Sequence, residues 1–472
     1  MKMRRTKIVC TLGPASNSPD VIEQLLDSGM NVVRINMSHG THDEHAETIR
    51  RVRSAALKLG LHVPILSDLT GPKMRIATLA AGSVDLKAGD TFSLTSRDVP
   101  GDSSIASINY APLVEDVDPG DRILMGDGEM ELRAVSETQT DLRCEVVIGG
   151  ELKSNQGINA PGVKLREEVP TTKDIVDVRF GVEQNVDWFA LSFVRYAREV
   201  QRLRELLTDH DAEIPIVVKI EKIEALDNLD DILSAADGVM IARGDLGLEI
   251  PLAEVPLVQK DVIQMAIESG RPVITATQML ESMINNPRPT RAEAADVANA
   301  VFDGTDAVML SGETAIGRYP VEAVRTMAQV AAASEARIDY GARLEGEMLH
   351  EHGPIAEAIA HAACSTAIEI DARVIICCTR SGQTARLVSR FRPPMPIAAV
   401  SPSPETLRRV GLYWNTLAVG TVLHEDVDDM MDAAKAAVLS LGIAERGDNV
   451  VIVAGVPIAE PGSTNVIKGD VL

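Results

Sequence analysis

The sequence predicts an α/β protein: a (β/α)8 TIM barrel with an inserted all-β domain and a C-terminal α/β regulatory domain. Three observations support this prediction. Short apolar, β-branched runs alternate with helical patterns; the alternation stops once, between 73 and 168; and it restarts after about residue 340. Near-continuous apolar runs between helices are typical of parallel strands covered on both faces. An open doubly wound sheet is the alternative that spacing alone leaves open.

The barrel is expected to occupy residues 1–72 and 169–340. Each predicted strand ends in polar residues or glycine, and helical patterns such as 18–29 and 253–270 follow. The eight runs predicted as barrel strands are 7–13, 31–38, 63–69, 188–193, 214–220, 237–244, 271–278 and 306–312.

Residues 73–168 carry frequent turn signals, including "AGD", "DPGD" and "GDGE". Alternating segments lie between these turns, as in 83–96 and 130–150. Alternation with glycine-rich turns is typical of antiparallel strands. We therefore expect a small all-β domain, a lid over the top of the barrel.

Residues 341–472 are expected to form a separate α/β domain. The pattern begins with an alanine-rich helix and closes on the apolar run "NVVIVAG", expected to be the final strand. The predicted elements are a helix at 354–370, a strand at 373–379, a helix at 384–391, a strand at 396–401 and the last strand at 449–455.

Composition excludes several classes of function. The chain has 472 residues, 45% of them hydrophobic and 24% charged, with a net charge of −23. Such a charge argues against nucleic acid or an anionic membrane as a partner. The five cysteines are not spaced like those of a disulfide-bonded framework, so we expect reduced thiols. The sequence has no run of about 18 apolar residues that could span a membrane, and we expect a cytoplasmic protein.

Polar residues follow nearly every predicted barrel strand. The carboxyl ends of barrel strands form the active face, and side chains two positions apart share one face of a strand. One polar residue there is more often a helix cap, but buried charges that converge must pair or bind ions. The residues at these ends are Arg34, Asn36, Ser38, Asp68, Ser192, Lys219, Glu221, Arg243, Asp245, Thr277, Ser311 and Glu313.

The charged members of this set indicate phosphoryl transfer. Glu221 and Asp245 on adjacent strands suit Mg²⁺ (or Mn²⁺), which retains water and accepts substrate oxygens. Lys219 and Arg34 suit anionic oxygens. Phosphoryl transfer needs such positioning and charge neutralisation. The sequence contains no Walker A loop and no protein-kinase H-R-D signature.

Long motifs resemble those of the pyruvate kinase family from end to end. They are "TKIVCTLGPAS", "NVVRINMSHGTHDEH", "VVKIEKIEALDNLDDIL", "GVMIARGDLGLEIP", "TATQMLESMINNPRPTRAEAADVANAVFDGTDAVMLSGETAIGRYP" and "PGSTN". The resemblance implies the fold expected above. It also implies the last step of glycolysis, transfer of the phosphoryl group of phosphoenolpyruvate to ADP, which gives pyruvate and ATP.

The resemblance also implies roles for individual residues. Catalytic roles fall on Lys219, Arg34, Thr277 and Ser311, with Glu313 beside Ser311 in a shell that protonates the enolate. Substrate binding falls on Arg34, Gly244, Asp245 and Thr277, and metal binding on Glu221 and Asp245. Nucleotide binding falls on Asn36, Ser38, His39, Arg75 and Lys173.

Lys73 stands where many family members have a glutamate. Members with the glutamate need K⁺, and those with lysine generally do not, so the resemblance implies that K⁺ is not required. An ammonium group at Lys73 would supply a fixed positive charge in place of the ion. The K⁺ region maps to Asn36, Ser38, Asp68, Leu69 and Lys73.

The loop at 378–387 places Thr379, Ser381, Gly382 and Thr384 between a strand and a helix. Backbone N–H groups there can hold a phosphate, and an ordinary capped turn is the alternative. In the family this loop binds a phosphorylated activator, so we expect a sugar phosphate or nucleotide monophosphate as effector. The loop 456–462 has no arginine or tryptophan for a second phosphate, which argues against fructose 1,6-bisphosphate. A homotetramer is also expected.

Two other classes of function are open. A Mg²⁺-dependent barrel lyase or aldolase acting on an enolate also uses carboxylates at the barrel mouth, but it needs neither the inserted domain nor Arg75. A catalytically inactive sensor would keep the C-terminal domain without the chemistry, whereas this chain keeps Lys219, Glu221 and Asp245.

Overall fold

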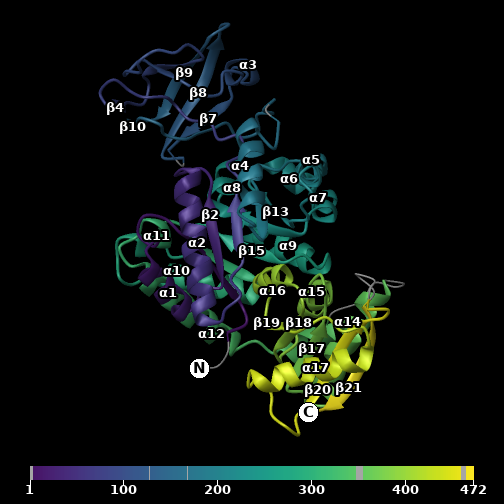
Figure 1. Ribbon diagram of the computed structural model, residues 1–472. Helices are drawn as coiled ribbons and strands as arrows, with labels where there is room; N and C mark the ends of the chain where they lie inside the picture. The colour runs from purple at the N-terminus through teal and green to yellow at the C-terminus, as the bar shows by residue number, and fades with distance from the viewer. Residues whose placement is uncertain (1–3, 127, 167, 347–353, 459–463) are drawn as a thin grey trace.

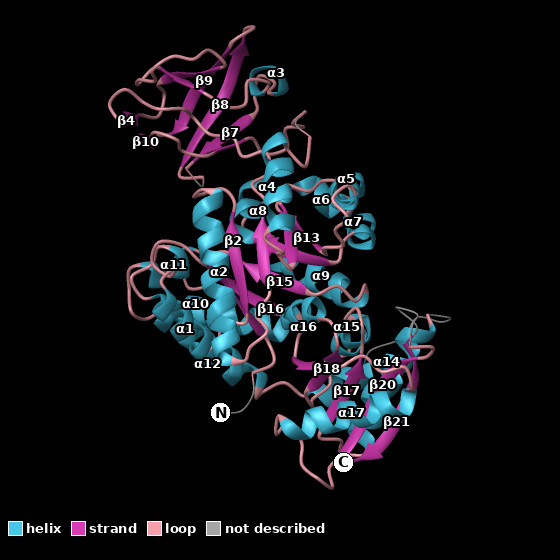
Figure 2. Cartoon of the chain, in the orientation of Figure 1, coloured by secondary structure: helices cyan, strands magenta, loops and turns pink. Residues whose placement is uncertain are grey.

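A computed structural model describes residues 4–126, 128–166, 168–346, 354–458 and 464–472. The chain forms three bodies in a row (Figure 1), with the barrel between the inserted domain and the C-terminal domain. Figure 2 shows helices around the barrel strands, an inserted domain of strands and long loops with one short helix, α3, and mixed structure in the C-terminal domain. The predicted fold class is confirmed.

Eight parallel strands close the barrel in the order β1-β16-β15-β14-β13-β12-β3-β2. Closure rules out the open-sheet alternative. Each strand lies inside the run that predicted it and is shorter than that run. The strands are β1 (Lys7–Thr11), β2 (Val32–Asn36), β3 (Ile65–Asp68), β12 (Trp188–Leu191), β13 (Ile216–Ile220), β14 (Gly238–Ala242), β15 (Val273–Ala276) and β16 (Ala307–Leu310).

Local capping fixes where the barrel helices begin and end. In α2 (His42–Leu59), Thr41 and Glu44 form a capping box, and Gly60 ends the helix in the left-handed conformation at φ 65°. The other helices around the barrel are α1 (Pro19–Ser28), α4 (Thr172–Glu183), α5 (Ala197–Thr208), α6 (Ile223–Asp227), α7 (Leu229–Ala235), α8 (Arg243–Glu249), α9 (Val255–Glu268), η1 (Glu281–Ile284), α10 (Arg291–Asp303), α11 (Gly312–Ala315), α12 (Pro320–Glu335) and α13 (Tyr340–Gly346).

The inserted domain has its own sheets and its own apolar core. Its two connections to the barrel lie side by side, because the Gly71 N–H donates to Asp174 Oδ1 at 3.1 Å and Lys173 Nζ donates to Thr70 Oγ1 at 3.2 Å. The sheet order is β11-β7-β8-β9-β5-β6, with a second pair β10-β4. The elements are β4 (Ser83–Leu86), β5 (Thr91–Thr95), β6 (Ile105–Ser107), α3 (Leu113–Asp116), β7 (Arg122–Met125), β8 (Met130–Glu137), β9 (Asp141–Ile148), β10 (Gly150–Lys153) and β11 (Ile158–Asn159).

The C-terminal domain is a five-stranded sheet in the order β19-β18-β17-β20-β21. The expectation that the run 449–455 is the final strand was wrong. That run is β20, and β21 follows and pairs with it antiparallel. Strand β19 was not predicted either. The elements are α14 (Ile355–Glu369), β17 (Val374–Cys378), α15 (Gln383–Arg390), β18 (Ile397–Ser401), α16 (Pro404–Arg409), η2 (Val410–Leu412), β19 (Thr416–Gly420), α17 (Val427–Ser440), β20 (Asn449–Gly455) and β21 (Thr464–Val471).

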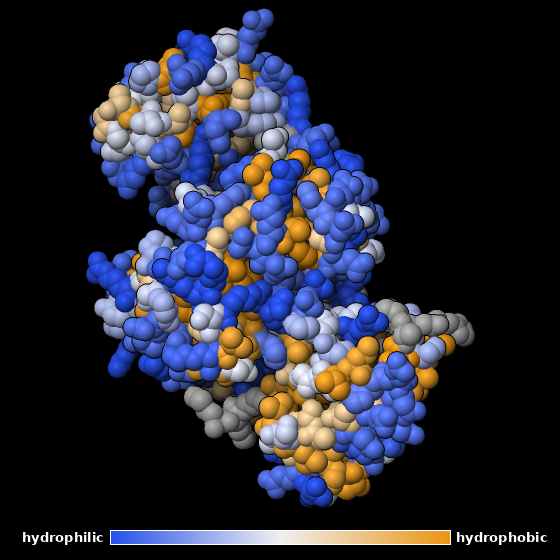
Figure 3. Space-filling model, viewed as in Figure 1, coloured by the Kyte–Doolittle hydropathy of each residue, from blue (hydrophilic) through white to orange (hydrophobic). Residues whose placement is uncertain are grey.

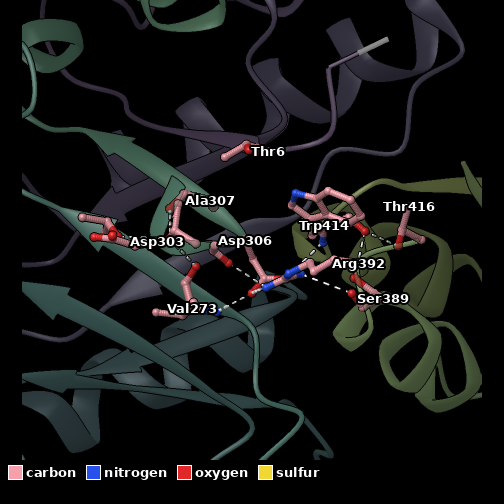
Figure 4. A network of polar contacts seen from close by, with 12 residues as sticks. Thr6, Val273, Asp303, Asp306, Ala307, Ser389, Arg392, Trp414 and Thr416 are labelled. Atoms are coloured by element: carbon pink, nitrogen blue, oxygen red, sulfur yellow. Dashed lines mark hydrogen bonds and ion pairs between the residues drawn. The ribbon is translucent and has the colours of Figure 1, made fainter. Parts of the chain in front are cut away.

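The barrel and the C-terminal domain share one hydrophobic cluster. Leu66 and Trp188 of the barrel belong to the same cluster as Ile375 of the C-terminal domain. A buried ion pair crosses the same boundary (Figure 4): Arg392 donates to the two carboxylate oxygens of Asp306 at 2.7 and 2.8 Å. Removing both charged groups from water needs such paired geometry. These two domains therefore pack as one unit.

On the face shown in Figure 3, most of the surface over the barrel helices is hydrophilic, and apolar residues gather on the C-terminal domain. None of the described helices is long and apolar enough to cross a lipid bilayer.

Candidate active site

Lys219 is the centre of a polar cluster at the carboxyl end of the barrel. Its side chain is 11% exposed, and Nζ lies 2.8 Å from Glu221 Oε1 and 3.3 Å from Asp68 Oδ1. Nζ also donates to Ser192 Oγ at 2.8 Å. Three neighbouring strands, β3, β12 and β13, thus supply the anions and the hydroxyl that hold this ammonium group.

Arg34 approaches the same cluster from β2. Its Nε donates to Asp68 Oδ2 at 2.6 Å, and its Nη1 donates to Thr11 Oγ1 at 2.9 Å. Asp68 therefore divides its two oxygens between Arg34 and Lys219. The two cations are held near one another by a single buried carboxylate.

The charges in the cluster adjust each other's pKa values. Burial alone would raise the pKa of Asp68, but Arg34 and Lys219 outweigh it and hold that pKa below its ordinary value. Burial alone would likewise lower the pKa of Lys219, but Asp68 and Glu221 raise it above its ordinary value. Lys219 is therefore a permanent cation at neutral pH.

Glu221 and Asp245 fit the requirements of a hard divalent cation. The pKa of Glu221 is raised, first by burial and also by the nearby charge of Asp245. Two like charges in a buried site favour a bound cation. Glu221 Oε2 is fixed by the Phe193 N–H at 2.7 Å. The described residues contain no group of three or more His, Cys, Asp or Glu side chains placed to hold a metal. Mg²⁺ is commonly bound by one or two carboxylates, together with water and substrate oxygens.

Thr277 follows β15 in a left-handed conformation, with φ 65°. Its Oγ1 accepts a hydrogen bond from the Gly244 N–H at 2.8 Å, which joins the end of β15 to the start of α8. Non-glycine residues with positive φ are often found at functional sites. Arg243, also expected at this face, donates to the Thr277 carbonyl at 2.8 Å and to Asp296 Oδ1 of α10 at 2.7 Å.

Ser311 follows β16 and precedes the short helix α11. The carboxylate of Glu313 accepts hydrogen bonds from the Ser311 N–H at 2.8 Å and the Leu280 N–H at 3.0 Å. Burial raises the pKa of Glu313. The buried Glu313 therefore orients the backbone of Ser311, whose hydroxyl group is at the strand end.

The five residues expected to bind nucleotide are near the junction of the barrel and the inserted domain. The pKa of His39 is lowered first by burial and then by the charges of Arg75, Lys73 and Arg34, so these cations lie around His39. Lys173 Nζ donates to the Met37 carbonyl at 2.8 Å. The Asn36 side chain accepts a hydrogen bond from the Ser38 N–H at 3.1 Å.

Two family models match this chain. A model described as "Pyruvate kinase, barrel domain" matches residues 3–324, and one described as "Pyruvate kinase, alpha/beta domain" matches residues 357–468. The chain belongs to the pyruvate kinase family. Members are phosphotransferases, and the family implies a divalent metal requirement. The pyruvate kinase fold expected from the resemblance is confirmed, and the lyase alternative is not favoured.

Curated relatives support the pyruvate kinase assignment over the whole chain. The pyruvate kinase of Geobacillus stearothermophilus is 46% identical over 472 residues, which cover 99% of this chain and 80% of that protein. The enzyme of Staphylococcus aureus strain MRSA252 is 44% identical over 468 residues, covering 99% and 80%. The crystal structure of a pyruvate kinase from Cryptosporidium parvum has a TM-score of 0.92 at 36% identity and covers 99% of this chain and 96% of that one.

A cavity of this pyruvate kinase chain lies in the C-terminal domain. Thr379, Ser381 and Thr384 line it, and it encloses about 70 Å³. Gly382, with φ 88°, precedes α15, and its N–H donates to Thr379 Oγ1 at 2.9 Å. The Thr384 and Thr464 hydroxyl groups are 2.8 Å apart. The loop 456–462 was expected to lack a ligand for a second phosphate. Its residues 459–462 lie outside the described residues.

Two supporting contacts, those of Thr11 and Lys222, were not predicted, and Ser192, predicted at a strand end, had been given no role. Thr11 binds Arg34, Ser192 binds Lys219, and Lys222 forms a buried ion pair with Glu249. Thr11 ends strand β1, which was the available signal. The pairing of Lys222 with Glu249 has no such signal, because it depends on how the end of α8 meets the segment between β13 and α6.

Proposed function

We propose that the chain transfers the phosphoryl group of phosphoenolpyruvate to ADP at the carboxyl face of the barrel. The single observation that carries this proposal is the Lys219 cluster, in which a buried ammonium group shares Asp68 with Arg34 and contacts Glu221. Two fixed cations beside two carboxylates suit an anionic substrate accompanied by a divalent cation.

The reaction breaks the bond between phosphorus and the enol oxygen of phosphoenolpyruvate while a β-phosphate oxygen of ADP bonds to phosphorus. Arg34 and Lys219 stabilise the phosphoryl oxygens during transfer, and Lys219 also stabilises the enolate that is left. Thr277 and the Gly244–Asp245 backbone hold the substrate carboxylate. A proton delivered on the side of Ser311, which Glu313 orients, converts the enolate to pyruvate.

Glu221 and Asp245 would hold Mg²⁺ or Mn²⁺, which neutralises charge on the phosphoryl oxygens when bound. The raised pKa of Glu221, caused first by burial and also by Asp245, supports this assignment. Asn36, Ser38, His39, Arg75 and Lys173 would hold the nucleotide.

The inserted domain acts as a lid that excludes water from the reacting groups. The proximity of Gly128 to α8 supports this role: a Cβ atom there would lie 3.0 Å from Leu248 Cδ2. The loop of the inserted domain therefore already approaches the helix that carries Asp245.

We propose that activity does not require K⁺. Both oxygens of Asp68 pair with cations, the Leu69 carbonyl accepts from Ser192 at 2.7 Å, and the Asn36 side chain accepts from the Ser38 N–H. Asp68, Leu69 and Asn36 are three of the four residues whose oxygens the family resemblance assigns to a bound K⁺; the fourth is Ser38. The charge of Lys73 already acts on His39. The pKa of His39 is lowered first by burial, then by the charge of Arg75 and then by that of Lys73.

The cavity at Thr379, Ser381 and Thr384 is the proposed site of a phosphorylated effector. We also propose that the protein is a homotetramer and is cytoplasmic. The hydroxyl groups of the cavity and the start of α15 suit one phosphate. Calorimetry with sugar phosphates and nucleotide monophosphates is the test. Binding that Ser381→Ala and Thr384→Ala do not weaken would contradict the site.

The overall proposal is tested by coupling pyruvate formation to its reduction in the presence of phosphoenolpyruvate, ADP and Mg²⁺. Pyruvate formation that depends on both substrates is expected. Pyruvate release from an enolate precursor without ADP would instead support a lyase, and no turnover with intact metal binding would support a sensor.

A further inference from the structure

A groove rich in arginine lies where the amino end of the barrel meets the C-terminal domain. It has a volume of about 440 Å³. The barrel contributes Arg204 of α5 and Asp237 before β14, and the C-terminal domain contributes Arg386 of α15 and Arg409 of α16. Figure 1 shows α15 and α16 next to the barrel end of the C-terminal domain. We call these residues the arginine groove.

The cations of the arginine groove are not equally satisfied. Arg204 donates to Asp237 Oδ2 at 2.8 Å and to the Ala235 carbonyl at 2.9 Å. The Nε atoms of Arg386 and Arg409 are buried and have no hydrogen-bond partner, and neither side chain forms an ion pair within the described ranges. The other carboxylate of the lining, Glu213, is exposed. Two guanidinium groups in the groove therefore lack an anion.

The positive charge of the groove lowers the pKa of a neighbouring cation. The pKa of Arg271 is lowered, first by burial and then by the charge of Arg386. A partly buried cation without a counter-ion is costly, and proteins keep such groups paired. The lining of the groove thus has three arginine charges against the two carboxylates of Glu213 and Asp237.

We propose that the arginine groove binds a small phosphate-bearing anion, either inorganic phosphate or a phosphate monoester. Guanidinium groups bind phosphate through paired, charge-assisted hydrogen bonds. Arg386 and Arg409 would contact the anion from the C-terminal domain, and Arg204 would contact it from the barrel. Such an anion bridges the two domains at one point.

This site is distinct from the effector cavity in the same domain. Ser381 borders both spaces, but Arg386 and Arg409 line only the groove, and Thr379 and Thr384 line only the effector cavity. The groove is also remote from the active face, because Asp237 precedes β14 while Asp245 follows it. Variants can therefore address each site separately.

The test is a calorimetric titration of the full chain with inorganic phosphate, followed by glucose 6-phosphate and sulfate. Arg386→Gln and Arg409→Gln should each weaken one phosphate-binding event by about tenfold or more, as expected for loss of a charge-assisted hydrogen bond. Arg325→Gln, which removes an exposed charge on α12, is the matched control and should leave binding unchanged. Stronger binding of glucose 6-phosphate than of phosphate would identify a monoester as the ligand.

Three outcomes would overturn the proposal. One is phosphate binding that Arg386→Gln and Arg409→Gln leave intact. A second is binding that only Thr379→Ala or Thr384→Ala removes, which would assign it to the effector cavity. The third comes from thermal unfolding without phosphate: the two arginine variants should unfold at the same temperature as the parent or higher, because the lost cations are unpaired. A large decrease in the unfolding temperature of both variants would mean that these arginines stabilise the fold and do not serve a ligand.

Discussion

Lys222 and Glu249 form an ion pair in which Nζ lies 2.5 Å from Oε1, and the two residues are only 4% and 8% exposed. Lys222 comes directly after Glu221, and Glu249 ends the helix α8 that carries Asp245. The two proposed metal ligands are therefore on segments that this ion pair joins.

Lys222→Met should destabilise the protein by about 3–5 kcal/mol, because it leaves Glu249 buried without its cation. Metal affinity should fall as well, since the end of α8 is no longer tied to the segment that follows β13. In the double variant Lys222→Met, Glu249→Met, stability should recover while the raised metal requirement persists. Urea unfolding and Mg²⁺ titrations of activity measure the two effects. A metal requirement that recovers together with stability would argue against a positioning role.

Lys219→Met should lower kcat by about 10² to 10⁴, as expected for loss of a preorganised electrostatic group. The expected cause is the loss of positive charge beside the transferred phosphoryl group and the enolate. Steady-state kinetics measures kcat, and circular dichroism checks that the fold is kept. A folded variant with near-normal kcat would refute the catalytic role.

Glu221→Gln and Asp245→Asn should each raise the Mg²⁺ concentration needed for half-maximal activity. Each change removes one negative charge from the proposed metal site but keeps the size of the side chain. Asp261→Asn, on the exposed side of α9, is the matched control and should not change the requirement. If the metal titrations of both site variants overlay that of the parent, the carboxylates serve only the structure.

Lys73→Glu should create a K⁺ requirement or abolish activity, while the parent enzyme should work without K⁺. The change replaces a fixed cation with an anion that needs one. The assay uses a bulky organic counter-cation at matched ionic strength, and Lys87→Glu, an exposed charge of the inserted domain, is the control. A rise of about tenfold or more when K⁺ is added to the parent would contradict the prediction.

Stability should depend on pH through Lys7. Burial, and then the charge of Arg4, lowers the pKa of Lys7 from 10.5 to about 7, and Nζ donates to the Thr416 carbonyl at 2.7 Å. Between these two pKa values the unfolded chain binds a proton that the folded chain does not. The contribution of Lys7 to the free energy of unfolding should therefore rise by about 1.4 kcal/mol per pH unit from about pH 7 to 10.

Lys7→Met should remove this slope. Other groups titrate in the same range, including buried cysteines whose pKa values are raised by burial, so the difference between parent and variant is the quantity to measure. Urea unfolding at several pH values gives that difference. A constant difference across the range would show that Lys7 is charged throughout.

The barrel could be predicted because its signal is local. Each of the strands is a short apolar run, and the polar residue that ends it is on the active face. The arrangement of the Lys219 cluster could not be predicted, because Ser192 and Asp68 reach Lys219 through the pairing of β3 with β12 and β12 with β13. That register is a property of the closed barrel.

Strand β21 escaped prediction for a related reason. Its sequence, "TNVIKGDV", is polar and mostly exposed, as expected of an edge strand. Strand β21 is held in place by its pairing with the buried strand β20, and not by apolar residues of its own. The pairing of Lys222 with Glu249 was not predicted, because the sequence does not distinguish a buried charged residue at these positions from a solvent-exposed one.

The inserted domain leaves and rejoins the barrel at neighbouring points, where Gly71 binds Asp174 and Thr70 binds Lys173. Its core contains only its own residues. The barrel therefore does not need the insert to bring β3 and α4 together. In evolutionary terms the insert is a module: it can be gained, lost or enlarged between these two points while the chain order of the barrel stays the same.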